Sequence, residues 1–142
     1  DDSLVTASDS LLIYYDSDRD EKWRKEFGRI FSCDTVLGKY IAAAVDTRGK
    51  ESDGAGHSGV VIFNARGQQT AEYKIDDEVR NIRSYSDLIA VNTGREVHFI
   101  NTRGKLIGKY SSKTDITDVY FFNKLEVLVV TKNNVVVVKT NL

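Results

Sequence analysis

The chain of 142 residues contains no proline, no methionine and a single cysteine, Cys33. One cysteine cannot form a disulfide within the chain and leaves the redox compartment open. Its position in a short apolar stretch predicts a buried thiol that behaves as a small hydrophobe. Because proline is absent, the turns must depend on glycine, asparagine and aspartate. No apolar run approaches the roughly 20 residues that a membrane-spanning helix needs.

Neither sign of charge is in excess, since 20 Lys and Arg residues face 21 Asp and Glu residues and the net charge is -1. Proteins that bind nucleic acid usually carry a basic face, so we expect no nucleic-acid partner. A composition with 41% hydrophobic and 29% charged residues is typical of one globular domain. The sequence shows no initial methionine and no signal peptide, and we expect a trimmed or mature chain. A removed N-terminal anchor would be its only link to a membrane.

The sequence does contain an internal repeat. Residues 60–67 (VVIFNARG) are followed by residues 97–104 (VHFINTRG), 37 positions later, and the same offset relates Tyr73 to Tyr110. A fixed period of this length, with units that read as short strands, is the signature of a repeat array. We therefore expect residues related by this offset to occupy similar environments, with the two tyrosines packed between neighbouring units.

Helical signals are weak, and only residues 19–27 have a helix-like composition, at a position where the other units read as strand. Elsewhere β-branched and aromatic runs alternate with Gly, Asn, Asp and Ser, which predicts strands in groups of four. The expected strands are 4–7, 11–15 and 22–27; 29–33, 40–45, 59–63 and 70–74; 79–84, 88–92, 96–100 and 106–110; and 116–122, 126–131 and 134–139. They divide a single domain, residues 1–142, into units of about 1–27, 28–74, 75–110 and 111–142.

Three of the expected strands, 41–45, 88–91 and 127–130, are apolar at consecutive positions, which indicates that both faces are covered. The strand at 106–110 is more polar and suits an outer edge. Buried inner strands beside a wetter outer strand predict an all-β chain of about three and a half four-stranded propeller blades. Since propellers close with roughly four to eight blades, the chain would be a fragment of a longer propeller, half of a two-copy ring, or four incomplete blades that close alone. The alternative fold is a β-trefoil, but strands that are apolar at consecutive positions argue against it.

Three segments share a turn motif: 16–27 (DSDRDEKWRKEF), 64–69 (NARGQQ) and 101–106 (NTRGKL). They resemble the repeats of quinoprotein-like (PQQ-repeat, WD40-like) propellers, in which Asp or Asn ends the third strand and a large apolar residue opens the fourth. Trp23 and Leu106 stand at that apolar position. The pattern is also similar to uncharacterised, membrane-anchored extracytoplasmic propeller families of bacteria. The resemblance implies a scaffold without redox activity or cofactor, located outside the cytoplasm or at the cell surface.

Asp16, Asp18 and Asp20 have the alternate spacing of a calcium-binding loop. Such a loop needs a glycine at its sixth position and a bidentate glutamate at its twelfth, and those positions hold Glu21 and Phe27. We therefore interpret the three aspartates as the tip of a hairpin and expect no metal.

Signatures of catalysis are missing as well. The chain has no Gly-x-Ser-x-Gly nucleophile elbow, and its glycine-rich segment at 54–56 precedes no helix, so it cannot act as a phosphate-binding loop. His98 alternates with apolar residues and is expected to be a hydrogen-bonded structural residue. We expect a non-enzymatic protein without catalytic, cofactor-binding or metal-binding residues. The alternatives are a hydrolase or lyase with its active site in the central channel, and a carbohydrate-binding trefoil module.

Two segments are candidates for recognition. The insertion 46–58 (DTRGKESDGAGHS) interrupts the repeat as a polar, glycine-rich loop of the kind that often binds partners. Three consecutive aromatic residues near the end of the chain cannot all point inward, so at least one is expected at a blade face or an interface. The candidate residues are Lys50, Glu51, Asp53 and His57 in the loop, and Tyr120, Phe121 and Phe122. The expected partner is another protein or a second copy that completes the ring, with strands 127–130 and 135–138 in the contact.

Overall fold

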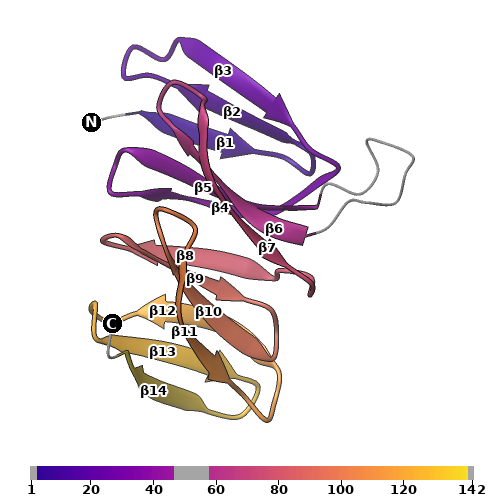
Figure 1. Ribbon diagram of the computed structural model, residues 1–142, viewed down its shortest axis with the longest axis vertical. Coiled ribbons are helices and arrows are strands. Elements are labelled where there is room, and N and C mark those ends of the chain that lie inside the picture. The colour runs from indigo at the N-terminus through magenta and orange to yellow at the C-terminus, as the bar shows by residue number, and fades with distance from the viewer. Residues whose placement is uncertain (1–2, 47–57, 141–142) are drawn as a thin grey trace.

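The computed structural model describes residues 3–46 and 58–140, which form four antiparallel β-sheets (Figure 1). The first sheet contains β1 (Leu4–Ala7), β2 (Leu11–Tyr15) and β3 (Glu21–Glu26). The second contains β4 (Arg29–Val36), β5 (Tyr40–Asp46), β6 (Ser58–Asn64) and β7 (Gln69–Ile75). The third contains β8 (Asn81–Tyr85), β9 (Leu88–Asn92), β10 (Glu96–Asn101) and β11 (Leu106–Ser111). The fourth contains β12 (Ile116–Phe121), β13 (Glu126–Thr131) and β14 (Val135–Lys139).

In every sheet, strands that are consecutive in the chain are neighbours, and the four sheets follow one another along the longest axis of the molecule (Figure 1). Four small antiparallel sheets that pack face to face are the blades of a propeller. The all-β, partial-propeller prediction is therefore confirmed, and the β-trefoil alternative is wrong. The first and fourth sheets lie at opposite ends of the arc, so each has one face that no other described sheet covers.

The expected strands are all present, with differences at their ends. The largest differences are at β4, which continues to Val36 instead of ending at Cys33, and at β8, which begins at Asn81 instead of Val79. The Arg80 N–H still donates to the Asn92 carbonyl oxygen (2.7 Å), but the Val79 side chain turns into the core between the second and third sheets. Residues 19–27, helix-like in composition, contain the strand β3, because only an extended chain can complete the first sheet.

Adjacent sheets are joined by three apolar cores, and each inner sheet contributes to two of them. Strand β5 shows how. Ile41, Ala43 and Val45 belong to the core against the first sheet, whereas Ala42 and Ala44 belong to the core against the third. All five are buried, as expected for a strand covered on both faces.

The turns after β2, β6 and β10 share one hydrogen-bonding pattern. The side-chain oxygens of Asp16, Asn64 and Asn101 each accept hydrogen bonds from the backbone N–H groups two and four residues later, at distances of 2.9 to 3.0 Å. The residue three positions on has a positive φ, which is 68° at Arg19, 79° at Gly67 and 74° at Gly104. The hairpin-tip interpretation of the Asp16 segment is confirmed. Lys139 ends β14 at the matching position of the fourth sheet and makes no such turn in the described chain.

Residues related by the 37-residue offset do occupy similar environments. Tyr73 packs into the core between the second and third sheets, and Tyr110 packs into the core between the third and fourth. The Tyr73 hydroxyl lies 2.7 Å from Nδ1 of His98, whose ring is buried and meets the tyrosine ring edge-on. His98 is hydrogen-bonded, as predicted.

The register corrects one match that the resemblance implied. Trp23 pairs with Tyr14, and the residue at the same position of the third sheet is Gly108, which pairs with Phe99. Leu106 pairs instead with Ile100, beyond an irregularity in the ladder, and its side chain is exposed. The first sheet has the same irregularity, between Tyr14 and Tyr15, so it does not cause the mismatch. Counting along the chain from Asp16 to Trp23 and from Asn101 to Gly108 gives the same distance, whereas Leu106 is two residues nearer to Asn101.

Candidate functional site

The uncovered face of the fourth sheet is the candidate site. Cross-strand pairing places Tyr120, Leu128 and Val137 in one row, and Val130 and Val135 in the next. Residues paired in this way lie on the same face of a sheet. The opposite face, which includes Val119, Val127 and Val129, packs against the third sheet. We call these five residues, which share the uncovered face with Asp118, Glu126 and Lys139, the C-terminal end face.

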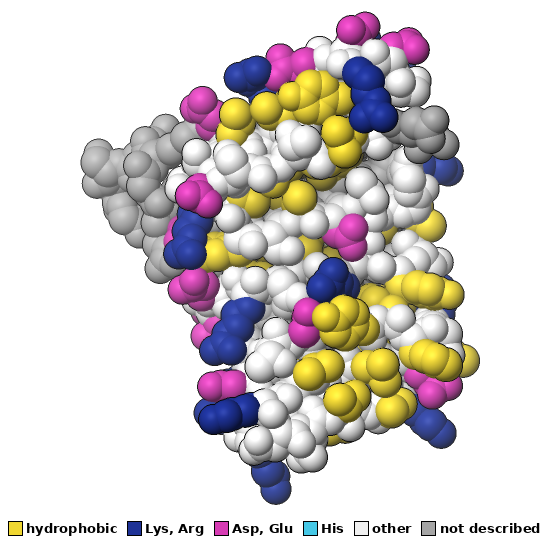
Figure 2. Space-filling model, turned by 180° about the vertical axis from the view of Figure 1, so that it is seen from behind, with side chains coloured by type: hydrophobic (Ala, Val, Ile, Leu, Met, Phe, Trp, Pro, Cys, Tyr) yellow, Lys and Arg dark blue, Asp and Glu magenta, His cyan; other side chains and the backbone are white. Residues whose placement is uncertain are grey.

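The matching positions of the two inner sheets are covered. In the second sheet Val60 and Ile62 are 1% and 0% exposed, and in the third sheet Val97 and Phe99 are 0% and 3% exposed. Val135 and Val137, at the end of the arc, are 62% and 53% exposed. The fourth sheet therefore presents, in water, side chains of the kind that its own neighbours bury. Figure 2 shows hydrophobic side chains gathered over the lower end of the molecule, where this sheet lies.

The first sheet presents a second uncovered face at the other end of the arc. Leu4 pairs with Tyr15 and Thr6 pairs with Ile13, and these residues face away from the second sheet. Their neighbours Val5 and Tyr14 point the opposite way, into the core against the second sheet. We call Leu4, Thr6, Ile13 and Tyr15 the N-terminal end face.

The three aromatic residues that were predicted as candidates, Tyr120, Phe121 and Phe122, lie in different environments. Phe121 packs into the core between the third and fourth sheets, with its ring stacked on Tyr85 (5.7 Å between centroids) and edge-on to Phe99 (6.4 Å). Tyr120 lies on the C-terminal end face beneath the Arg83 guanidinium, which is 5.0 Å from the centroid of its ring. Phe122, just beyond β12, is 69% exposed.

The inner strands β8 and β12 meet through a polar network centred on Asp118. This carboxylate accepts hydrogen bonds from Asn81 Nδ2 (2.7 Å), Arg83 (3.2 Å) and the Tyr120 hydroxyl (2.8 Å). Burial alone would raise the pKa of Asp118, but the hydrogen bonds from Tyr120, the Val119 backbone, Arg83 and Asn81 outweigh it and lower the pKa. The Asp118 carboxylate therefore joins the third and fourth sheets through these hydrogen bonds. Because its pKa is lowered, it is ionised at neutral pH and has no proton to donate.

A similar bond joins the second and third sheets. Asp34 Oδ2 accepts hydrogen bonds from the backbone N–H (2.8 Å) and the hydroxyl (2.9 Å) of Ser84, and the Ser32 hydroxyl accepts one from the Ile82 N–H (3.2 Å). Cys33, between them, is half-buried and not fully buried as predicted. Burial, with a smaller contribution from the Asp34 charge, raises the pKa of its thiol, so the thiolate is disfavoured.

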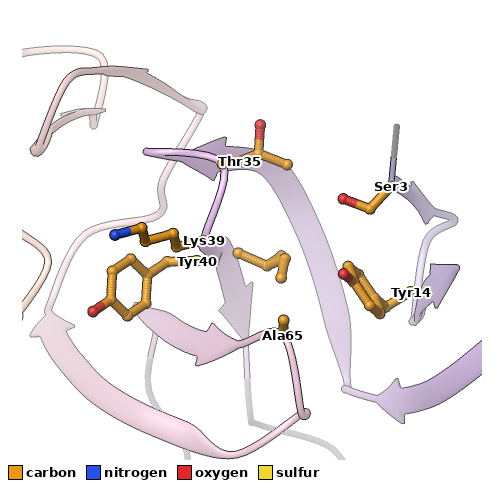
Figure 3. Close-up of a pocket in the computed structure, with 8 residues that line it drawn as sticks. Ser3, Tyr14, Thr35, Lys39, Tyr40 and Ala65 are labelled. Atoms are coloured by element: carbon orange, nitrogen blue, oxygen red, sulfur yellow. The ribbon is translucent and has the colours of Figure 1, made fainter. Parts of the chain in front are cut away.

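A small pocket lies where the first and second sheets meet, lined by Ser3 and Tyr14 on one side and by Thr35, Lys39 and Tyr40 on the other (Figure 3). Its volume is about 90 Å³. That space holds a few water molecules and is far below the several hundred Å³ typical of sites for small-molecule ligands. The pocket is therefore part of the joint between the two sheets.

The loop candidates Lys50, Glu51, Asp53 and His57 lie outside the described residues. Over residues 3–46 and 58–140, no group of three or more His, Cys, Asp and Glu side chains is placed to hold a metal ion. Within those same ranges no helix has the length and apolar character needed to cross a membrane.

The model of DUF5711, a family of unknown function, matches residues 1–140. This chain belongs to the DUF5711 family. No curated protein matches the DUF5711 chain.

Solved structures similar to the DUF5711 chain support the fold. The computationally designed protein Ika4 has a TM-score of 0.76 at 11% identity, over 98% of this chain and 86% of Ika4. BamB from Moraxella catarrhalis has a TM-score of 0.70 at 21% identity, over 96% of this chain and 41% of BamB. BBS1N, solved in complex with ARL6DN, has a TM-score of 0.66 at 13% identity, over 92% of this chain and 47% of BBS1N. The DUF5711 chain thus has a propeller-like fold and spans less than half of the latter two.

Sequence reasoning missed two features of the DUF5711 chain. It did not name the residues of the N-terminal end face, such as Leu4 and Ile13. It also missed the hydrogen bonds that Ser84 donates to Asp34, because the two residues are 50 positions apart and do not follow the repeat offset.

Proposed function

We propose that the DUF5711 chain is a non-enzymatic β-propeller scaffold for protein interaction, and that its partner is a second copy that completes the ring. The observation that carries the proposal is the exposure of Val135 and Val137 at positions that are buried in the two inner sheets. Exposed apolar patches rimmed by polar residues mark interaction sites. Among the similar structures, BBS1N was solved in complex with ARL6DN.

The two end faces have complementary roles in the arc. The C-terminal end face corresponds to the faces that inner sheets turn toward the next sheet, such as that of Val97 and Phe99. The N-terminal end face corresponds to the faces that inner sheets turn toward the preceding sheet, such as that of Ile89 and Ile100. A contact between the fourth sheet of one copy and the first sheet of another would therefore repeat a packing mode that the chain already uses three times.

Two such contacts, related by a twofold axis, would close a ring. The four described sheets of each copy give eight in total, which is within the range of four to eight blades at which propellers close. Each contact joins unlike surfaces, and such head-to-tail contacts produce closed rings when the rotation between copies closes.

The hydrogen bonding of the carboxylates on the inner strands supports the non-enzymatic part of the proposal. A hydrolase or lyase in the central channel would need carboxylates free to exchange protons, whereas Asp34 and Asp118 are both hydrogen-bonded across blade junctions. We also propose a location outside the cytoplasm, which is supported only by the resemblance to extracytoplasmic propellers. Cell fractionation of the native protein would test it, and recovery in the cytoplasm would refute it.

The interaction proposal is tested by light scattering over a range of protein concentrations. The wild-type chain is expected to have twice the 16.0 kDa mass of one copy, and to become a single copy on dilution. Val137→Lys, on the C-terminal end face, and Ile13→Lys, on the N-terminal end face, should each yield the mass of one copy. Burying an unpaired ammonium in an apolar contact costs several kcal/mol.

The matched control is Ile107→Lys, because Ile107 is similarly exposed but lies on β11, away from both end faces. It should leave the mass of the wild-type complex unchanged. An equimolar mixture of the two end-face variants retains one intact contact per pair and should regain part of the dimer at high concentration. A wild-type chain that remains a single copy at every concentration would refute the proposal.

A further inference from the structure

The turns after β4, β6, β8, β10 and β12 all project from one edge of the stack, at the left of Figure 1. They do so because the strands within each sheet are antiparallel and the first strands of the second, third and fourth sheets run in the same direction. We call residues 37–39, 65–68, 85–87, 102–105 and 122–125 the turn edge. It belongs to the second, third and fourth sheets and is distinct from both end faces.

Three turns of this edge expose large apolar side chains. Phe122 and Leu125, after β12, are 69% and 58% exposed, and Leu37, after β4, and Tyr85, at the end of β8, are exposed as well. In the described part of the chain, no turn on the opposite edge exposes a large hydrophobic side chain. Figure 2, seen from behind, shows hydrophobic side chains reaching the right margin of the lower half, where the turn edge lies. Apolar exposure in turns is therefore confined to one edge.

The turn that carries Phe122 and Leu125 is held in place by hydrogen bonds. Asn123 Oδ1 accepts a hydrogen bond from the Leu125 N–H (2.8 Å), and the Lys124 carbonyl oxygen accepts one from the Thr140 hydroxyl (2.6 Å). Neither Phe122 nor Leu125 belongs to the core between the third and fourth sheets. The fold thus fixes the turn while leaving these two apolar side chains in water.

The charged residues of the turn edge are mainly basic. It holds five basic residues and one acidic residue, Asp87, whose carboxylate lies 3.0 Å from the Lys124 ammonium. The described connections on the opposite edge of the same sheets, residues 76–80, 93–95, 112–115 and 132–134, hold four basic and four acidic residues. The other basic side chains of the turn edge are exposed and form no ion pair within the described ranges: Lys39, Arg66, Arg103 and Lys105.

Apolar side chains that stand among basic ones suit the surface of a bilayer with anionic lipids. The apolar groups enter the boundary between headgroups and acyl chains, and lysine and arginine are attracted to the headgroups. A peptide or helix would instead need a groove for its apolar side chains. On the turn edge these side chains stand on separate turns, and the pocket beside Gly38 and Lys39 has a volume of only about 90 Å³. An anionic bilayer therefore fits this edge better than an acidic polypeptide does.

We propose that the turn edge docks on the surface of a membrane that contains anionic lipids. Phe122 and Leu125 enter the lipid boundary, and the unpaired basic side chains contact headgroup phosphates. The corresponding turn of the first sheet holds Asp16, Asp18 and Asp20 with one basic residue, Arg19, so it is kept away from the surface and the fourth sheet lies nearest. This contact is made by the folded domain itself, in addition to the removed anchor that the sequence led us to expect. It does not depend on ring closure, because the end faces take no part.

The test is cosedimentation of the chain with vesicles, at a protein concentration at which light scattering shows a single copy, so that self-association does not contribute. Vesicles of phosphatidylcholine are compared with vesicles in which about one third of the lipid is phosphatidylglycerol. The wild-type chain should sediment with the anionic vesicles and remain in solution with the neutral ones. Added salt should weaken the binding, because it screens the attraction between basic side chains and headgroups.

Two variants separate the apolar contribution from the basic one. Phe122→Ser should weaken binding about tenfold, because it removes an aromatic side chain that enters the lipid boundary. Arg103→Gln should weaken binding about fivefold, the contribution of one basic residue near an anionic surface. The matched controls lie at the opposite edge, where Val135→Ser removes an exposed apolar side chain and Lys132→Gln removes an exposed charge. Both controls should bind as the wild-type chain does.

A tryptophan at position 122 reports insertion directly. The chain has one other tryptophan, Trp23, in the first sheet. In Phe122→Trp the emission should shift to shorter wavelength on anionic vesicles, and lipids with brominated acyl chains should quench it. Absence of binding to anionic vesicles would overturn the inference, and so would equal loss of binding in the opposite-edge variants. Charge-dependent binding that Phe122→Ser leaves unchanged would also refute it, and would indicate a soluble acidic partner instead.

Discussion

The turn after β10 offers a quantitative test of how the repeat stabilises the fold. Asn101→Ala removes the side-chain oxygen that accepts hydrogen bonds from the backbone N–H groups of Arg103 (2.9 Å) and Lys105 (3.0 Å). The backbone bonds of the turn, including that from the Gly104 N–H to the Asn101 carbonyl oxygen, would remain. A neutral hydrogen bond contributes about 0.5 to 1.5 kcal/mol, and water can replace part of it in an exposed turn. We therefore expect a loss of about 1 to 2 kcal/mol in the free energy of unfolding.

That loss corresponds to a decrease of about 3 to 7 °C in the midpoint of thermal unfolding for a domain of this length. The assay is calorimetry at one fixed protein concentration, in the Ile13→Lys background, so that self-association does not contribute. Asn101→Asp keeps the acceptor, as Asp16 does naturally, and should remain within about 0.5 kcal/mol of the parent. Lys139→Ala, at the matching position without a turn, is the control and should have no effect. If Asn101→Asp is as damaging as Asn101→Ala, the hydrogen bonds are not what stabilises this turn.

Three further predictions concern stability. Burial lowers the pKa of His98 in the folded protein, so on acidification the unfolded chain binds a proton before the folded chain does. The free energy of unfolding should therefore fall as the pH drops below about 6.5, which urea unfolding at pH values of about 5 and 7.5 would measure. His98→Gln should remove this pH dependence. Arg19→Gly should raise stability by about 1 kcal/mol, because Arg19 has a φ of 68° that favours glycine; an unchanged thermal midpoint would contradict this. Gly104→Ala should lower the midpoint of thermal unfolding, because its Cβ would lie 2.7 Å from the Glu72 carbonyl oxygen. Gly38→Ala is the control, since Gly38 has a similar positive φ but no atom within 4 Å of the added Cβ, and it should lower the midpoint less.

Most of the architecture was accessible from sequence because it depends on local patterns. Consecutive apolar residues in β5 identified a strand buried on both faces, and the offset between Tyr73 and Tyr110 identified side chains that pack between blades. Asn64 and Asn101 marked two turns correctly, since an Asx side chain bonds to the backbone a few residues away. Each of these signals is carried by residues within one blade or one period.

What was missed depends on neighbours that sequence does not reveal. Cys33 reads as buried, but it faces the first sheet, which has only three strands and covers β4 incompletely. The match of Leu106 to Trp23 is an exception, because counting from Asn101 and from Asp16 already places Gly108 at the position of Trp23. The candidate surfaces were only partly predicted, because their exposure depends on whether a neighbouring sheet covers them. The apolar character of Val135 and Val137 is evident in the sequence, but whether another sheet covers them is a property of the whole arc.

The serial stacking of the sheets has a consequence for how the molecule unfolds. Each inner sheet is held by two apolar cores and each terminal sheet by one, so structure should be lost from the ends of the stack before its middle. Amide protons of β5 and β9 should then exchange with deuterium more slowly than those of β1 and β14. If closure by a second copy occurs, this gradient should flatten, because the chain would no longer have a terminal layer from which to fray.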